Sequence, residues 1–517
     1  MSETAKAPLS ELARQRLDEE TKRRRPAGLA RWLLLIVPAL WSLFQLWITS
    51  PISYALGVGV LNDTAARSLH LGFAVFLAYL GFPLLKSGPK DHVPAYDWIL
   101  AFAAAFCAAY LYIFQTELSG RPGIPARKDI VVACLGMLTL LEATRRVMGL
   151  PMTCVALIFL LYVFAGPYAP DMIAHRGASV SRAASQFWLT QEGVFGVPLG
   201  VSASFVFMYV LFGAMLERAG AGAYLTALSF ALLGRLRGGP AKAAVVASGL
   251  HGLISGSSIA NVLTCGPVTI MLMKKVGFSA EKAGGVEVAA GSNGQIMPPV
   301  MGAAAFLMAE YINMPYAQII KHAFIPALLA YGSLLYIVHL EALKLGMEGR
   351  PGSRRPWASR LLPGALTISA LLAVMGGLYY LTAWIPLVCG RWAWLAFVLL
   401  LAAGYAGLLL LSTRFPDLPE GDSEALMNLT AAVPILFSGL YYLLPIAALV
   451  WGLMALEMSP GLAAYYACLM MAFIILTRRP FLAWRRKQPI GRAALDAVST
   501  LMDGLVGGAR NMVGIGL

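Results

Sequence analysis

Apolar runs that are long enough to cross a membrane recur along the whole chain, and short polar or basic segments separate them. One crossing of a bilayer takes about 20 predominantly apolar residues in a helix. The pattern therefore predicts an all-α polytopic membrane protein. We expect crossings near residues 30–49, 68–86, 96–115, 129–146, 150–168 and 194–217, and later near 317–340, 361–385, 392–412, 430–457 and 460–478.

The segment between two groups of lysines does not fit a simple crossing. Residues 243–273 carry no charge, and they lie between Lys242 and the pair Lys274–Lys275. As one helix they would be about 46 Å long, which is too long for one crossing and too short for two. Lysine at both ends favours the cytoplasmic side for both ends. We therefore expect a re-entrant helical hairpin with its tip at Ser255–Ser258, where Gly256 relieves the backbone.

The next apolar segment, residues 283–309, is long enough to span once but contains helix breakers in its middle. Gly291, Gly294 and the pair Pro298–Pro299 interrupt the helix, because proline lacks the N–H group and clashes with the preceding turn. Backbone freed at membrane depth is tolerated only where protein or a wet cavity surrounds it. Two interrupted elements side by side are typical of the midplane ion and substrate site of a secondary transporter.

Composition and charge agree with a membrane protein. The chain is 59% hydrophobic and 13% charged, with a mean hydropathy of +0.70. We interpret the net charge of +14 as membrane topology and not as nucleic-acid binding. Most basic residues fall on one side of the predicted crossings, which makes that side and the N-terminus cytoplasmic. The six cysteines are scattered and suggest neither a zinc site nor a disulfide framework.

The composition of the sequence changes after residue 168, from closely spaced apolar runs to glycine-rich membrane sequence, and this suggests that the chain is divided into several parts. We expect a cytoplasmic N-terminal segment (1–28), a compact transmembrane domain (29–168), a first repeat with the hairpin and broken helix (169–343), a cytoplasmic linker (344–360), further scaffold helices (361–487) and the start of a second repeat (488–517). The short echo between residues 181–187 and 491–497, on opposite sides of the membrane, is what inverted repeats produce. On this interpretation the second repeat is incomplete at Leu517, and we expect a fragment or a truncated gene product.

The two central motifs carry a family resemblance. Residues 252–261 (GLISGSSIAN) and 287–300 (EVAAGSNGQIMPPV) resemble the tripartite ATP-independent periplasmic (TRAP) transporters. Residues 141–146 (LEATRR) resemble the fused-permease branch of the TAXI type, in which a four-helix small subunit precedes the large subunit. The family's large subunit has two hairpins and two unwound crossings, and this sequence supplies the first of each.

The resemblance implies an elevator transporter of a bacterial or archaeal inner membrane. It implies import of an organic acid, a carboxylate, that an extracytoplasmic solute-binding protein delivers. The coupling ion would be sodium, with the proton as the alternative, and no other cofactor, no enzymatic activity and no nucleic-acid partner is expected.

The candidate site residues are the small polar residues and helix breakers at the two interruptions. Sodium is a hard cation that takes oxygen ligands, and helix N-termini can meet a substrate carboxylate. The ion-binding candidates are Ser255, Gly256, Ser257, Ser258, Asn261, Gly291, Ser292, Asn293, Gly294 and Gln295, and the substrate-binding candidates are Ser258, Asn293, Pro298 and Pro299. The alternative is that their hydrogen bonds only close a tight turn.

Glu287 lies one turn before the second break, inside apolar sequence. It either carries a proton or adds charge to the ion site, or it is a glutamate paired within the bundle. His251 and His322 are interpreted as packed residues.

The residues are also compatible with three further functions. Ser255 and His251, four residues apart, are the only basis for an intramembrane serine protease, since a catalytic dyad needs a base within reach of the serine. An elevator anion symporter that needs no binding protein is the second, and a non-transporting remnant is the third.

Overall fold

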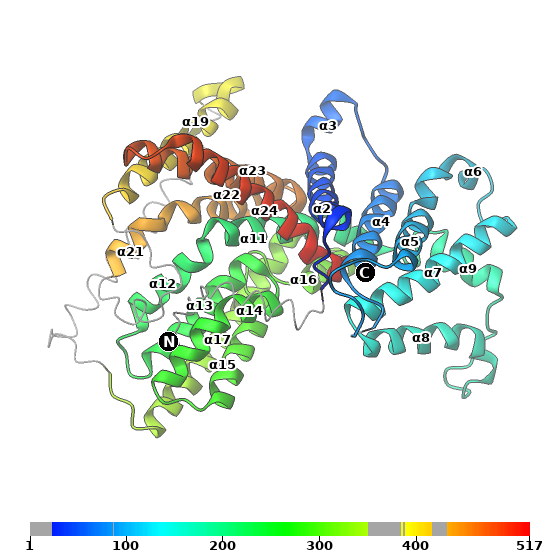
Figure 1. Ribbon diagram of the computed structural model, residues 1–517, viewed down its shortest axis with the longest axis horizontal. Coiled ribbons are helices and arrows are strands. Elements are labelled where there is room, and N and C mark those ends of the chain that lie inside the picture. The colour runs from blue at the N-terminus through cyan, green and yellow to red at the C-terminus, as the bar shows by residue number, and fades with distance from the viewer. Residues whose placement is uncertain (1–22, 86, 350–383, 386–387, 416–431) are drawn as a thin grey trace.

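The computed structural model describes residues 23–85, 87–349, 384–385, 388–415 and 432–517, and the regular structure in these residues is helical (Figure 1). The expectation of an all-α polytopic membrane protein is confirmed. Seven helical stretches in the described part are long and apolar enough to cross a membrane: Gly28–Thr49, Ala95–Ile113, Leu150–Tyr168, Val197–Ala219, Tyr316–Lys344, Ala432–Met454 and Pro460–Arg485. The crossing expected at 361–385, most of the linker expected at 344–360 and most of segment 1–28 lie outside the described residues.

The N-terminal part is a group of helices at one end of the molecule (Figure 1). It comprises α2 (Gly28–Thr49), α3 (Pro51–Leu56), α4 (Asp63–Gly81), α5 (Ala95–Ile113), α6 (Gln115–Ser119), α7 (Arg127–Val147), α8 (Leu150–Ala165) and α9 (Val180–Trp188). The helices α4 and α5 pack closely through buried alanines such as Ala78 and Ala108, since small residues let two membrane helices approach.

The ends of α4 follow from local chemistry. Asn62 caps the helix, because its Oδ1 accepts a hydrogen bond from the N–H group of Ala65 at 2.8 Å. At the other end Phe82 is extended, and Pro83 follows it, which stops a helix. The helix therefore runs about five residues earlier than the crossing that we expected at 68–86.

Buried charges tie the N-terminal part together. Asp97 on α5 accepts from Arg24 at 2.5 Å through Oδ2 and from Arg146 on α7 at 2.7 Å through Oδ1. The Arg146 guanidinium also bonds Glu142 at 2.7 Å and lies over the ring of Tyr79. These residues join the segment before α2 to α4, α5 and α7, so Glu142 and Arg146 of the LEATRR motif have a structural role in this chain.

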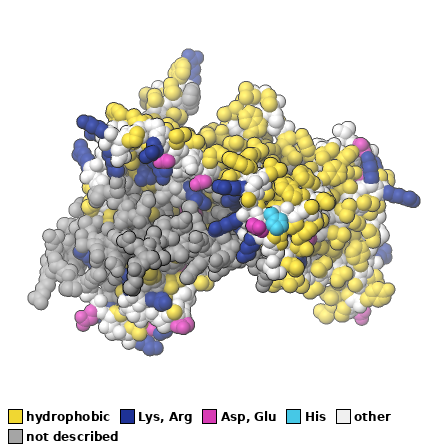
Figure 2. Space-filling view, in the orientation of Figure 1, with side chains coloured by type: hydrophobic (Ala, Val, Ile, Leu, Met, Phe, Trp, Pro, Cys, Tyr) yellow, Lys and Arg dark blue, Asp and Glu magenta, His cyan; other side chains and the backbone are white. Residues whose placement is uncertain are grey.

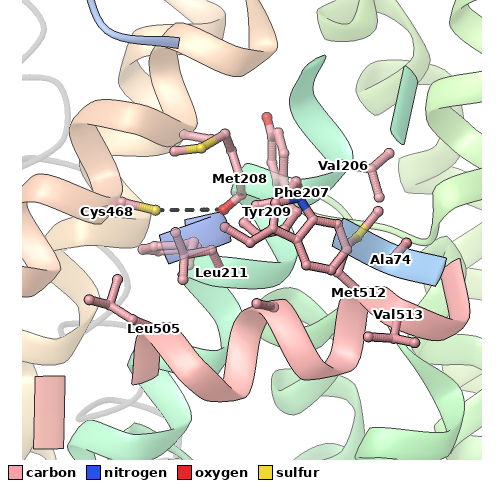
Figure 3. Close-up of a cluster of buried hydrophobic side chains, with 14 of the residues drawn as sticks. Ala74, Val206, Phe207, Met208, Tyr209, Leu211, Cys468, Leu505, Met512 and Val513 are labelled. Carbon is pink, nitrogen blue, oxygen red and sulfur yellow. Dashed lines mark hydrogen bonds between the residues drawn. The ribbon is translucent and has the colours of Figure 1, made fainter. Parts of the chain in front are cut away.

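The second large part is built around α11 (Phe207–Ala219), which follows α10 (Val197–Val201) and a π-helical turn (Ser202–Val206). The C-terminal helix α24 (Ile490–Gly516) packs against α11, α23 (Pro460–Arg485) and α2, and it crosses the middle of the molecule (Figure 1). Figure 3 shows their shared core, in which Met208, Tyr209 and Leu211 lie with Leu505 and Met512.

The similar segments 181–187 and 491–497 lie on α9 and at the start of α24, and α24 packs against α11, which follows α9 and α10 in the chain. Gly504 of α24 lies against Met215 of α11, and Gly508 lies against Leu211, so the two helices run antiparallel. The two similar segments differ in the helices that they form. Residues 491–497 begin the continuous helix α24, whereas residues 181–187 form the separate helix α9.

Further helices of this second part lie outside the hairpin and the interrupted segment. They are α12 (Ala221–Leu233), α17 (Tyr316–Lys344), α19 (Ala393–Ser412), α21 (Ala432–Gly439) and α22 (Leu443–Met454). The crossing expected at 430–457 is interrupted by a 3-10 turn, Leu440–Tyr442, between α21 and α22.

Candidate functional site

The segment between the lysines forms two helices joined by a very short tip. The helix α13 (Gly239–Ser255) ends at Gly256, whose φ of 57° is in the left-handed region that favours glycine. Ser257 then caps α14 (Ser258–Lys275), because its hydroxyl accepts from the N–H group of Ala260 at 3.3 Å. The tip between the helices is thus two residues long, at the centre of the four-residue tip that the sequence predicted.

The following segment is interrupted where the sequence places glycines and prolines. The helix α15 (Ala280–Asn293) continues into a 3-10 turn (Gly294–Ile296), and α16 (Ala303–Tyr311) begins after six non-helical residues. The Tyr316 hydroxyl lies 2.9 and 2.8 Å from the carbonyl oxygens of Pro299 and Val300. The N–H group of Gly302 donates to the Gln295 carbonyl at 2.7 Å. Hydrogen bonds within the protein therefore satisfy backbone carbonyl groups that the interruption leaves without a helical partner. Irregular backbone that is buried needs such partners.

The hairpin tip and the interruption lie directly against each other. A Cβ atom on Gly252 would lie 2.6 Å from the Cα atom of Gly294, and one on Gly256 would lie 1.9 Å from the carbonyl oxygen of Met301. Only glycine permits these approaches. The residues that the sequence predicted from two separate motifs are therefore neighbours.

Met301 itself shows backbone strain at this contact. Its φ is 54°, which is uncommon for a residue with a side chain, and the residue is buried. Such a conformation persists only where the surroundings impose it, and it is concentrated at functional sites.

Asn261 on α14 is a deeply buried polar side chain at this junction, with 1% of its surface exposed. Its Nδ2 donates to the Ser248 carbonyl at 2.8 Å, so the hairpin's two helices are linked. Its Oδ1 has no hydrogen-bond partner among the described residues. A buried amide oxygen without a partner costs free energy, and a bound cation or water would satisfy it.

A cavity of about 10 Å³ lies beside Asn261, which is close to the smallest volume that holds a water molecule or a small ion. Glu217 of α11 and Thr264 of α14 also line it, and the Thr264 hydroxyl donates to Glu217 Oε1 at 3.0 Å. Residues of two helices that carry side-chain oxygen atoms, Glu217, Asn261 and Thr264, are therefore part of the lining of this small cavity.

The other predicted residues are distributed around the same junction. Gln295 Nε2 donates to Ser258 Oγ at 2.8 Å, which links the interruption to the start of α14. Gly291, Gly294, Pro298 and Pro299 are buried, Asn293 is half-buried, and Ser292 and Gln295 are exposed. The side chain of Ser255 lies outside the described part of the structure.

Glu287 lies fully buried in α15, about two turns before the 3-10 turn at which the interruption begins. Its Oε2 accepts from the Thr269 hydroxyl of α14 at 2.6 Å. Its Oε1 has no hydrogen-bond partner among the described residues. Glu287 is thus hydrogen-bonded to the neighbouring helix α14, and its second carboxylate oxygen can still accept a hydrogen bond or contact a cation.

Comparison with known protein families matches the larger part of the chain. The family model described as "Tripartite ATP-independent periplasmic transporter, DctM component" matches residues 135–477, which is more than half of the chain. The chain belongs to this family. The match begins inside α7, upstream of the domain boundary that the sequence suggested near residue 169, so it does not mark that boundary.

Individual relatives of the DctM family are similar over shorter segments. The C4-dicarboxylate TRAP transporter large permease protein of Pseudomonas aeruginosa is 26% identical over 172 residues, which is 33% of this chain and 40% of the relative. The protein of the same name from Vibrio cholerae is 29% identical over 143 residues, 28% of this chain and 31% of the relative. The sialic acid TRAP transporter permease protein of Haemophilus influenzae is 26% identical over 172 residues, 33% of this chain and 28% of the relative. The alignments thus span less than half the length of these relatives.

The DctM family consists of transporters and not of enzymes, so the protease hypothesis is dropped. His251, which that hypothesis used as a base, is buried, and its Nε2 lies 3.0 Å from the Gly222 carbonyl and 3.3 Å from the Thr226 hydroxyl. It is the packed histidine that the sequence suggested.

Two groups at this site were missed from the sequence. Glu217 is an ionisable residue at the end of an apolar run, which is a signal that could have been used. Tyr331 of α17 donates its hydroxyl hydrogen to the Ala290 carbonyl at 2.8 Å and lies against Gly249. No local pattern distinguishes Tyr331 from the other tyrosines in apolar segments.

Proposed function

We propose that the chain is the membrane permease of a binding-protein-dependent secondary transporter that imports an organic acid together with sodium. The observation that carries the proposal is the junction of the hairpin tip with the interrupted crossing, where Asn261 keeps a buried amide oxygen without a partner among the described residues. Interrupted helices provide backbone dipoles and carbonyl oxygens at the depth where such transporters bind ions and substrates.

We assign the ion to the space beside Asn261, with oxygen atoms of Glu217 and Thr264 as further candidates. The substrate carboxylate would lie at the outer face of the junction, where Ser258 and Asn293 are only partly buried. The start of α14 offers N–H groups and a positive dipole end to an anion there. This arrangement puts cation and carboxylate close together, so each favours binding of the other.

An elevator mechanism needs a part that moves as one body. The contact of Gly252 with Gly294, the Tyr331 bond to Ala290 and the Gln295 bond to Ser258 hold α13, α14, α15 and α17 together. We propose that this group moves against α11, α23 and α24. The group has a buried cluster of its own around Met273, Ala290 and Tyr331, and it meets the core of α11 through Ile254 and Ile319.

The remaining assignments follow the family. Residues 29–168 would be the fused small subunit of a TAXI-type permease, and an extracytoplasmic solute-binding protein would deliver the solute. Relatives are named for C4-dicarboxylates and for sialic acid, which supports a carboxylate as the transported group. We place the N-terminus on the cytoplasmic side of a bacterial or archaeal inner membrane.

The test is sodium binding to the purified full chain, measured by thermal unfolding in sodium chloride and in potassium chloride at equal ionic strength. Sodium should stabilise the protein more than potassium does, because a ligand that binds the folded state raises its stability. Asn261→Ala removes the free oxygen and should raise the sodium concentration for half-maximal stabilisation about tenfold.

Asn511→Ala is the matched control, because Asn511 is exposed on α24 away from the junction. It should leave the sodium response unchanged. Equal stabilisation by the two salts, or an unchanged sodium response in Asn261→Ala, would refute the ion site. Uptake of radiolabelled succinate into proteoliposomes that contain the chain, with the solute-binding protein added outside, then tests the substrate class.

A further inference from the structure

Four aromatic rings form a contact between the interrupted segment and α11. Phe205 lies in the π-helical turn and Tyr209 in α11, whereas Phe306 lies in α16 and Tyr316 begins α17. The Phe306 ring is central: its centroid is 4.4 Å from that of Tyr316, 4.8 Å from that of Tyr209 and 5.2 Å from that of Phe205. We call these four residues the aromatic seam. Figure 3 shows Tyr209 among the buried side chains of α11.

The aromatic seam is connected directly to the junction at the hairpin tip. The Tyr316 hydroxyl lies 2.9 and 2.8 Å from the carbonyl oxygens of Pro299 and Val300. Val300 precedes Met301, whose carbonyl oxygen lies against Gly256 of the hairpin tip. A displacement of Tyr316 against α11 would therefore carry the interruption with it.

The contact across the seam is made by packing alone. Among the described residues, no hydrogen bond or ion pair joins α16 or α17 to α11 or to the π-helical turn. Apolar packing is not directional. Such a contact can open and close again without breaking hydrogen bonds, whereas broken hydrogen bonds would leave buried groups unpaired.

The hydroxyl group of Tyr209 is the exception within this apolar contact. The side chain is 1% exposed, and its hydroxyl has no hydrogen-bond partner among the described residues. Buried tyrosine hydroxyls usually have a partner, and the Tyr316 hydroxyl in the same seam has two carbonyl oxygens within reach. An unpaired buried hydroxyl costs free energy. The closed seam bears this cost, which ends when the hydroxyl meets water or another polar group.

The side of the seam that carries Phe205 is held by the N-terminal part. Ser202 Oγ of the π-helical turn lies 3.0 Å from His70 Nε2 of α4, and Gln45 Nε2 of α2 donates to the Ala203 carbonyl. Figure 2 shows hydrophobic side chains over most of the N-terminal part on the face drawn, which suits a part that stays embedded in lipid. The π-helical turn and α11 are therefore the fixed side of the seam.

We propose that the aromatic seam is the contact that opens when α16 and α17 move against α11, and that the Tyr209 hydroxyl favours this opening because it then gains a partner. The proposal rests on the transport mechanism proposed above. Tyr209 is a positioning residue, since it acts on the interruption through Phe306 and Tyr316.

The test is hydrogen–deuterium exchange of the backbone of α16, measured on the purified full chain in detergent without sodium. Tyr209→Phe removes the unpaired hydroxyl and keeps the ring, so the closed seam becomes more stable relative to the open one. Exchange in α16 should slow about fivefold, and the unfolding temperature should rise by about 2 °C. Phe306→Leu removes the central ring but keeps an apolar side chain, and it should speed exchange in α16 about fivefold.

Tyr79→Phe is the matched control, because Tyr79 is a buried tyrosine of α4 whose hydroxyl donates to the Thr139 carbonyl at 2.8 Å. It loses a hydrogen bond, so the unfolding temperature should fall while exchange in α16 stays the same. If Tyr209→Phe raises the unfolding temperature but leaves exchange in α16 unchanged, the hydroxyl has no part in opening and the proposal is wrong. Faster exchange in Tyr209→Phe, or unchanged exchange in Phe306→Leu, would also overturn it.

Uptake of succinate into proteoliposomes, with the solute-binding protein added outside, separates this proposal from the proposed function. Tyr209→Phe should slow uptake about fivefold and leave the sodium concentration for half-maximal uptake unchanged. Slower exchange in α16 together with unaltered uptake would overturn the link between the seam and transport. If the unaltered protein showed no response to sodium, the ion site would be wrong, and the exchange measurements without sodium would still decide whether the seam opens.

Discussion

The N-terminal bundle and the hairpin junction both bury polar oxygens, but they use them differently. In the bundle, each oxygen of Asp97 accepts a hydrogen bond from a different arginine. At the junction, Asn261 donates a hydrogen bond through Nδ2 and Glu287 accepts one through Oε2. The remaining side-chain oxygen of each residue has no partner among the described residues. Buried polar groups are normally satisfied, so the difference separates a group that holds the fold from groups that can accept a ligand.

The backbone shows the same contrast. The N-terminal helices end at ordinary caps such as Asn62 and pack through small residues. The hairpin junction brings Gly256 and Met301, both with positive φ, into direct contact. Strain and unpaired oxygens coincide at the junction. In the N-terminal part both oxygens of Asp97 are paired, and the atom of its ion-pair network without a partner among the described residues is a donor nitrogen, Arg146 Nη2. The following predictions test this contrast, beginning with the largest expected effect.

The largest effect is expected from Asp97→Asn in the bundle. The change removes the carboxylate charge between Arg24 and Arg146, two buried guanidinium groups. Breaking a buried ion pair by removing one partner costs about 3–5 kcal/mol. The free energy of unfolding, measured with denaturant in detergent, should fall by about this amount, while the sodium dependence of the remaining folded protein stays the same.

Asp63→Asn provides the comparison for that change. Asp63 also pairs with an arginine, Arg67, but its side chain is 61% exposed. Exposed pairs contribute only about 0–1 kcal/mol, so this variant should unfold almost like the unaltered protein. Similar losses in both variants would mean that the buried network contributes no more than a surface pair.

An intermediate effect is expected from Gly256→Ala at the hairpin tip. The new Cβ atom would meet the Met301 carbonyl oxygen, and the left-handed φ would be strained as well. Strain of this kind costs about 1–3 kcal/mol. The tip must move away from the interruption, so sodium-induced stabilisation should be lost along with part of the stability. Gly285→Ala, which meets no atom within 4 Å in α15, should keep both.

The helices and the two interruptions could be predicted from the sequence because their signals are local. Apolar run length identifies crossings, and Gly256 and the pair Pro298–Pro299 mark places where a helix cannot continue. The hairpin's short tip and the break before α16 lie where these residues predicted them.

The partners of each polar atom could not be predicted, since they lie on other helices, whether these are adjacent in the chain or far apart. Thr269 bonds Glu287, Ser248 bonds Asn261, and Arg24 reaches Asp97 across 73 positions. Long side chains meet according to how whole helices pack, which no short motif encodes. The inverted repeat stays a prediction: residues 181–187 form α9, residues 491–497 begin α24, and α24 packs against α11.

The smallest effect on stability is expected from Glu287→Gln, and it decides what the free oxygen of this side chain does. Glutamine has nearly the same shape and can still accept from the Thr269 hydroxyl, so the free energy of unfolding should change by less than about 1 kcal/mol. An ionised glutamate near the junction attracts a cation, whereas a protonated one does not. In the unaltered protein, the sodium concentration for half-maximal stabilisation should therefore fall as the pH rises.

In Glu287→Gln that pH dependence should disappear, because the variant has no proton to lose at this position. Glu310→Gln is the matched control, since Glu310 is an exposed glutamate at the end of α16, and it should retain the pH dependence. If the sodium response follows pH equally in the unaltered protein and in Glu287→Gln, then Glu287 serves only as a hydrogen-bond partner of Thr269. In that case the free oxygen at the junction that matters for the ion is that of Asn261 alone.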